Sequence, residues 1–142
     1  MTKVHLTTEL AVPAEMVWNT IGGFNALPDW HPAIAKSVVE KEGANRLRRL
    51  SLVGGGEIVE RLERSDDKER VYSYSILSGP LPVANYTASI RVRQAKGGQG
   101  CTVEWSSEFD PAGAPESEAA KVIRGIYEAG FENLKKMFGA QA

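Results

Sequence analysis

Hydrophobic positions at the start of the chain follow a period of two and then a helical period. Apolar and polar side chains alternate over residues 3–12, which predicts a half-buried strand ending before Pro13. Residues 14–21 place apolar side chains three and four positions apart and run into a glycine pair, which predicts a short helix. A second short helical turn is predicted through Asp29, with Asn25 as its cap.

The middle of the chain consists of apolar runs separated by short polar or glycine-rich turns. We expect six further strands, at residues 34–42, 47–53, 57–64, 70–77, 83–95 and 101–109. Because the connections are short, neighbouring strands should pair antiparallel as hairpins.

The helical period returns at Ser117 and continues to Phe138. This predicts one amphipathic helix of about 22 residues, spanning about 33 Å. The predicted order is strand, two short helices, six strands and a long helix. That order is an α+β fold in which a seven-stranded antiparallel sheet covers its apolar face with the C-terminal helix.

Alternation along the strands places two opposite charges on the inner face of the sheet. Arg48 and Glu60 fall in the inward register between apolar residues. A hairpin at Gly54–Gly56 would put Leu50 roughly opposite Glu60, with Arg48 within diagonal reach. An unpaired buried charge costs several kcal/mol, so each of these side chains needs a partner or access to water. Three interpretations remain open. The two side chains form a buried ion pair, turn outward at the sheet end, or supply the polar end of a ligand cavity.

Four aromatic side chains with polar atoms share that inner face. They are Tyr72, Tyr74, Tyr86 and Trp105. A dry core more often uses Leu, Ile or Phe, and buried tyrosines need hydroxyl partners. Ordinary core packing and a polar cavity lining both remain open.

Composition fits a single domain over residues 1–142, with 42% hydrophobic and 25% charged residues. A net charge of −1, from 17 basic and 18 acidic residues, argues against a nucleic-acid partner. Apolar runs fall short of the ~20 residues that a membrane span needs, so an integral membrane protein is not expected. One cysteine, Cys101, and no signal-type segment predict a cytoplasmic protein.

Metal and cofactor chemistry have little support in the sequence. The two histidines, His5 and His31, and the one cysteine have no ligand spacing, so we expect no metal and no cofactor. His31 is expected at the cavity rim, as a polar group at the entrance, a general base, or a plain surface histidine.

Short motifs in a fixed order resemble those of the START-like (SRPBCC) superfamily, across about residues 3–138. The motifs are Val17-Trp18, Phe24-Asn25, Trp30-His31-Pro32, Glu60-Arg61-Leu62, Tyr72-Ser73-Tyr74, Asn85-Tyr86 and Trp105-Ser106. The chain is most similar to the bacterial polyketide cyclase/dehydrase and lipid transport group. The plant abscisic-acid receptors and the birch-pollen-allergen family are more distant.

The resemblance implies a curved seven-stranded sheet gripping the C-terminal helix around an apolar cavity. Glu60 and Tyr86 match receptor residues that make water-mediated contacts to ligand. Loops 54–56 and 79–82 occupy the positions of the two receptor loops that close over the hormone, but lack their sequences. The receptors' lysine anchor falls near Pro32, so abscisic acid itself is not expected as ligand.

We therefore expect a binding module for a small hydrophobic molecule such as a lipid, polyketide or aromatic compound. The residues expected at the ligand are Trp30, His31, Arg48, Leu50, Leu52, Ile58, Glu60, Tyr72, Tyr74, Ile76, Tyr86, Trp105, Val122, Ile126 and Gly130. The alternative is a cyclase, aromatase or dehydratase with Glu60 as base and Tyr74 or Tyr86 stabilising an enolate. A third reading is a domain whose own side chains fill the cavity. Monomer and homodimer both remain open.

Overall fold

A computed structural model describes residues 1–140, and the last two residues of the expected domain lie outside the described residues. The elements are β1 (Thr2–Leu10), α1 (Ala14–Ile21), α2 (Leu27–Trp30), β2 (Ile34–Glu42), β3 (Asn45–Leu52), β4 (Glu57–Asp66), β5 (Val71–Ser78), β6 (Val83–Gln94), β7 (Cys101–Pro111) and α3 (Glu116–Phe138). The predicted order of strands and helices is confirmed.

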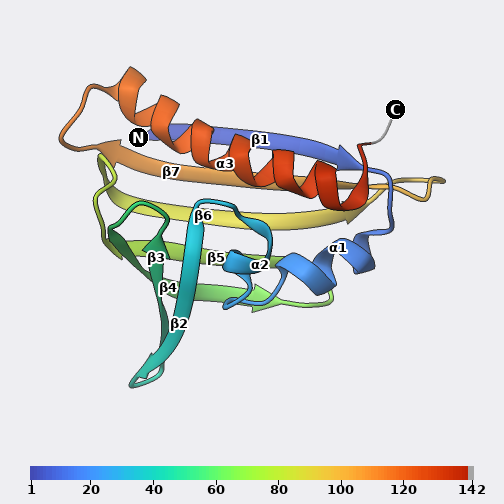
Figure 1. The fold of residues 1–142 in the computed structure, drawn as a ribbon, viewed down its shortest axis with the longest axis horizontal. Helices are drawn as coiled ribbons and strands as arrows, with labels where there is room; N and C mark the ends of the chain where they lie inside the picture. Colours follow the sequence, from blue (N-terminus) through green and yellow to red (C-terminus); the bar gives the residue numbers. More distant parts are fainter. Residues whose placement is uncertain (141–142) are drawn as a thin grey trace.

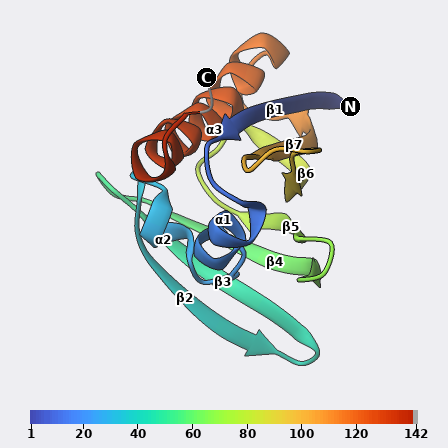
Figure 2. The ribbon, with the colours of Figure 1, turned by 90° about the vertical axis from the view of Figure 1, so that its right-hand side faces the viewer.

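The seven strands form one antiparallel sheet in the order β1-β7-β6-β5-β4-β3-β2. The sheet curves, and α3 lies along its concave side above β1 and β7 (Figure 1). Helices α1 and α2 lie within the same curve, below α3 (Figure 2). The α+β helix-grip fold expected from the sequence is therefore confirmed.

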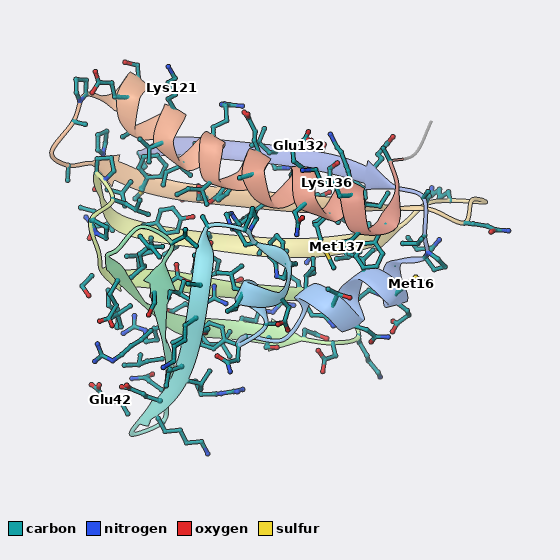
Figure 3. The ribbon with its side chains drawn as sticks, in the orientation of Figure 1. Met16, Glu42, Lys121, Glu132, Lys136 and Met137 are labelled. Atoms are coloured by element: carbon teal, nitrogen blue, oxygen red, sulfur yellow. The ribbon has the colours of Figure 1, made fainter. Side chains whose placement is uncertain are left out.

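Helix α3 buries one apolar face and carries charges at its ends that suit the helix dipole. Its sheet-facing side buries Ala119, Ile123, Tyr127, Gly130, Phe131 and Leu134. Lys121, Glu132 and Lys136 lie on the side turned away from the sheet (Figure 3). Acidic residues in the first turn and lysines in the last complement the helix dipole. No helix within residues 1–140 is long and apolar enough to cross a membrane.

The second short helix begins later than predicted. Helix α1 covers the predicted residues, but α2 starts after Ala26 and has no side-chain cap. The Ala26 N–H already bonds the carbonyl of Gly23 at 3.0 Å, so a preceding turn sets the helical backbone at Ala26. The predicted capping role of Asn25 is therefore wrong.

The hairpin between β3 and β4 has a register different from the predicted one. The Leu52 N–H donates to the Gly56 carbonyl at 3.0 Å, so the loop starts at Val53 and not at Gly54. This shift places Arg48 directly opposite Glu60, whereas Leu50 lies opposite Ile58. The predicted pairing of Leu50 with Glu60 is wrong, and the two charges are closer than diagonal neighbours.

Candidate ligand-binding site

Arg48 and Glu60 form an ion pair inside the molecule. Their facing positions on β3 and β4 bring Nη2 of Arg48 to 2.6 Å from Oε1 of Glu60, and Nε to 2.8 Å from the same oxygen. Arg48 is 1% exposed and Glu60 is 5% exposed. The first of the three sequence readings, a buried ion pair, is confirmed.

The Arg48 guanidinium is engaged by the protein on several sides. Its Nη1 donates to the Phe24 carbonyl at 2.7 Å and to the Tyr72 hydroxyl at 3.3 Å. Its carbon lies 4.4 Å from the Phe24 ring centroid and 5.0 Å from that of Tyr74. With the two contacts to Glu60, these bonds use four of the five N–H donors of the side chain.

The two carboxylate oxygens of Glu60 have different surroundings. Both Arg48 contacts go to Oε1, and no residue within 1–140 donates a hydrogen bond to Oε2. The side chain lines the internal cavity described below. Burial raises the pKa of the Glu60 carboxyl, and the charge and hydrogen bond of Arg48 oppose that rise.

Three tyrosine hydroxyls and an indole N–H form a chain of contacts beside Glu60. The Trp105 Nε1 donates to the Tyr74 hydroxyl at 3.0 Å, which lies 3.4 Å from the Tyr86 hydroxyl. The Tyr86 hydroxyl in turn bonds that of Tyr127, whose ring stacks on Trp105 at a centroid distance of 4.1 Å. Burial raises the pKa of Tyr74, Tyr86 and Tyr127, so these hydroxyls keep their protons at neutral pH.

The cavity between the sheet and α3 is small. Its volume is about 40 Å³. That is room for one or two waters, well below the roughly 300–1,000 Å³ of sites for drug-sized ligands. The hollow interior expected from the sequence is thus nearly filled by side chains in this structure. The lining residues are Leu27, His31, Ile34, Leu50, Ile58, Glu60, Tyr74, Ile76, Leu81, Tyr86, Trp105, Ile123, Ile126 and Tyr127.

A larger hollow of about 380 Å³ adjoins this cavity where β5 and β6 separate. The pairing of these strands stops at Ser75 and Thr87, and Asn85 adopts a left-handed φ of 53° beside a bulge in β6. Ile76, Leu81 and Tyr86 line both spaces. The strand separation therefore places an outer hollow directly against the inner cavity.

The predicted site residues divide into two groups. Those that line the inner cavity are His31, Leu50, Ile58, Glu60, Tyr74, Ile76, Tyr86, Trp105 and Ile126. Trp30, Arg48, Leu52, Tyr72, Val122 and Gly130 lie outside that lining. Arg48 and Tyr72 act behind the wall, through the bonds that hold Glu60. Contact of any of these residues with a ligand remains a prediction.

His31 was expected at the cavity rim, but the structure buries it and the neighbouring Trp30, with exposed fractions of 2% and 1%. The reason is Gly130 on α3, where an added Cβ would lie 2.9 Å from each of the two rings. Because Gly130 has no side chain, α3 packs directly against the Trp30 and His31 rings. His31 Nε2 then donates to the Ile126 carbonyl at 2.7 Å, and Nδ1 accepts from the Ala33 N–H at 3.1 Å. Burial lowers the pKa of His31, and its bond to Ile126 opposes this.

Val122 was expected in the apolar wall, but it is 40% exposed. Ile123 and Tyr127 occupy the centre of the buried stripe on α3, and Val122 lies beyond its edge. Tyr127 is the main polar cavity-lining residue that the predicted site lacked. Its signal was present, since it falls on the apolar face of the predicted helix at i+4 from Ile123.

Metal-ligating side chains do not gather anywhere in residues 1–140, where no group of three or more His, Cys, Asp or Glu could hold an ion. Cys101 is a buried free thiol, and burial raises its pKa. The polar groups at the cavity are therefore a carboxylate, tyrosine hydroxyls and a neutral imidazole.

The curved sheet gripping a long helix is a helix-grip fold. A START superfamily protein from Mycobacterium smegmatis shares this fold, with a TM-score of 0.79, 15% identity and 96% of each chain covered. The chain belongs to the family described as "Polyketide cyclase / dehydrase and lipid transport", whose model matches residues 1–139.

Two further relatives cover nearly the whole chain. The structure of XoxI from Bacillus cereus is similar with a TM-score of 0.91 and 40% identity, covering 97% of this chain and 96% of that one. MLP-like protein 423 from Arabidopsis thaliana is 27% identical, over 92% of this chain and 90% of its own. The sequence resemblance to the START-like superfamily is confirmed.

Proposed function

We propose that this protein binds a small, mostly apolar molecule between the sheet and α3, with its polar end at Glu60 and the Tyr74–Tyr86 hydroxyls. The observation that carries the proposal is Oε2 of Glu60, a carboxylate oxygen that receives no hydrogen bond from residues 1–140, on a side chain that lines the cavity. Such an oxygen needs a donor from a water or a ligand in the cavity, because the desolvation of a carboxylate is otherwise uncompensated.

Binding requires the cavity to enlarge, and the strand separation offers the means. Ile76, Leu81 and Tyr86 form the partition between the 40 Å³ cavity and the 380 Å³ hollow. Movement of Leu81, which lies on the β5–β6 loop and is only half-buried, would join the two spaces without breaking a paired part of the sheet. A ligand could then place its polar end at Glu60 and its apolar body outward.

The second candidate function is acid–base catalysis in the same cavity, as the family description "Polyketide cyclase / dehydrase" suggests. One observation favours it: Glu60 and protonated tyrosine hydroxyls face a common space. Glu60 would remove a proton, and Tyr74 or Tyr86 would donate a hydrogen bond to the developing enolate. Glu60→Gln should then abolish turnover of a cyclic-ketone or polyketide substrate while the protein still folds. Turnover unchanged in that variant would exclude the catalytic assignment.

Native mass spectrometry of protein taken directly from its producing cell tests the binding function. We expect a population of molecules heavier by one small organic compound, which solvent extraction releases and identifies. Ile126→Phe, which fills the cavity from α3, should lose that population. Val122→Phe makes a similar change one helical turn away at an exposed position, and should keep it.

The competing reading is a domain filled by its own side chains. It predicts no extra mass, no thermal shift across a library of hydrophobic compounds, and binding of an apolar dye only after Trp105→Ala opens space. That combination of results would contradict the proposed function.

A further inference from the structure

Within the proposed binding function, we propose that the ligand is a neutral apolar molecule carrying a hydroxyl group, such as an alcohol, phenol or enol, and not a carboxylic acid. At the cavity, some hydrogen-bond donors and acceptors already have partners within the protein, and others do not. This inference rests on the proposed function, because it names the chemistry of the polar end that the cavity would receive.

Glu60 supplies an acceptor that calls for a donor. Oε1 receives both Arg48 contacts, while no donor within residues 1–140 reaches Oε2, and the side chain is 6% exposed and lines the cavity. A carboxylate oxygen can only accept hydrogen bonds, so its ligand partner must bring an O–H or N–H. An unpaired buried carboxylate oxygen costs more than a neutral group, which makes this contact a strong selector.

The tyrosine chain supplies a donor that calls for an acceptor. Trp105 N–H and the hydroxyls of Tyr74, Tyr86 and Tyr127 together hold four protons but form three contacts with one another. One hydroxyl proton is therefore left over within this chain of contacts, and the buried Ser107 Oγ beside Tyr127 is an acceptor that competes with a ligand for it. A ligand hydroxyl satisfies both sides at once, because it donates to Glu60 and accepts from a tyrosine. An ether or ketone can satisfy the tyrosine alone.

The charge balance at the site disfavours an acid. Arg48 and Glu60 neutralise each other, and four of the five guanidinium donors are taken by Glu60, Phe24 and Tyr72. Among residues 1–140, neither Lys nor Arg lines the cavity. A ligand carboxylate would therefore enter beside the Glu60 charge without a free cation, which adds repulsion to the cost of desolvation.

Three probes with one ring system separate these requirements by titration calorimetry at pH 7.5. 2-Naphthol donates and accepts, 2-methoxynaphthalene only accepts, and 2-naphthoate carries a negative charge. We expect 2-naphthol to bind about tenfold more tightly than 2-methoxynaphthalene, as loss of one hydrogen bond to a buried charged group requires. 2-Naphthoate should bind most weakly of the three.

Glu60→Gln provides the matched variant. The glutamine amide removes the negative charge and can donate a hydrogen bond, so the preference for 2-naphthol over the other two probes should shrink. Glu63→Gln lies three positions along the same strand on the outer side, where its carboxylate bonds Ser75 and Arg61, and should leave the order unchanged. The order in the unmodified protein decides the matter even if Glu60→Gln does not fold.

The outcomes separate the two claims. If 2-naphthoate or 2-methoxynaphthalene binds as tightly as 2-naphthol, the hydroxyl preference is wrong and the binding function still stands. If none of the three binds and a wider hydrophobic library causes no thermal shift, the binding function fails and the ligand chemistry fails with it.

Discussion

Arg48 and Glu60 show how one buried pair shapes both stability and the site. Each side chain would be costly alone, and each becomes tolerable because its partner sits directly opposite on the neighbouring strand. The guanidinium is further held by the Phe24 carbonyl and the Tyr72 hydroxyl. These contacts hold the Glu60 carboxylate at the cavity wall through Oε1, and Oε2 receives no hydrogen bond from residues 1–140.

Glu60→Ala should lower the free energy of unfolding by about 3–5 kcal/mol, because it leaves the Arg48 charge buried without a partner. Urea denaturation followed by circular dichroism measures this change. Glu40→Ala is the control: Glu40 pairs with the adjacent Arg49 at 2.9 Å, but both side chains are more than 40% exposed. Screening by water should limit the loss there to about 0–1 kcal/mol. Similar losses in the two variants would contradict this account of the pair.

His31 should make stability depend on pH. Nε2 must carry the proton that is donated to the Ile126 carbonyl, and Nδ1 accepts from the Ala33 N–H, so a second proton has no place on the folded ring. The pKa of folded His31 is below the ordinary 6.5 of the unfolded chain. The unfolded state therefore takes up a proton first, and its uptake costs stability as the pH falls below about 6.5.

The His31 contribution is expected to be at most about 1.4 kcal/mol per pH unit between pH 6.5 and the lower pKa of the folded state. Urea unfolding at a series of pH values from 8 to 5 measures it. His31→Gln should flatten this part of the profile, while His5→Gln, at the exposed histidine on β1, should leave it unchanged. A profile of equal slope in the His31 variant would show that the histidine is not the titrating group.

Helix α3 carries two glycines with opposite roles. Gly125 has open space around it, whereas a Cβ at Gly130 would lie 2.9 Å from the buried rings of Trp30 and His31. Glycine lowers helix stability, so Gly125→Ala should raise the free energy of unfolding by up to about 1 kcal/mol.

Gly130→Ala should instead cause a net loss of about 1 kcal/mol or more, because overpacking against rings that cannot move exceeds the helix-propensity gain. Thermal and urea unfolding of the two variants side by side test this contrast. A stabilised Gly130→Ala protein would mean that α3 does not rest on Trp30 and His31 as described.

At the level of elements, hydrophobic periodicity predicted nearly all of the structure. The β2 boundaries and those of α1 match the predicted ones, since each segment has a clear period and a Pro or Gly at an end. The errors arose where a period gives no information. The loop at Val53 shifted the β3–β4 register by two residues, because sequence does not show which residue of a glycine-rich turn opens it.

The candidate site could be predicted only in part. Alternation placed Glu60, Tyr74 and Tyr86 on the inner face, and the structure brings them to one cavity. Strand patterns could not show how closely α3 approaches, which depends on Gly130 and decides that Trp30 and His31 are buried. Nor could they reveal that the volume between sheet and helix is about 40 Å³.

At the scale of the whole molecule, the fold combines a curved sheet and a long helix with a gap in strand pairing beside the cavity. The sheet is continuously paired from β1 through β7 and β6 along most of its length, and α3 closes its concave side (Figure 1). The pairing of β5 with β6 stops at Ser75 and Thr87, and the unpaired ends of these strands adjoin the cavity. Under the proposed function, a ligand would enter here by a local movement without global unfolding.

The NMR signal of the Trp105 indole N–H reports most directly on ligand binding between the sheet and α3, because this group donates to Tyr74 at the cavity wall. In ¹H–¹⁵N spectra recorded during a titration with 2-naphthol, we predict that its signal shifts and reaches saturation. The Trp18 indole, which bonds Asp67 away from the cavity, should stay in place, and Ile126→Phe should remove the Trp105 response. A Trp105 signal that does not move while 2-naphthol is in large excess would contradict ligand binding between the sheet and α3.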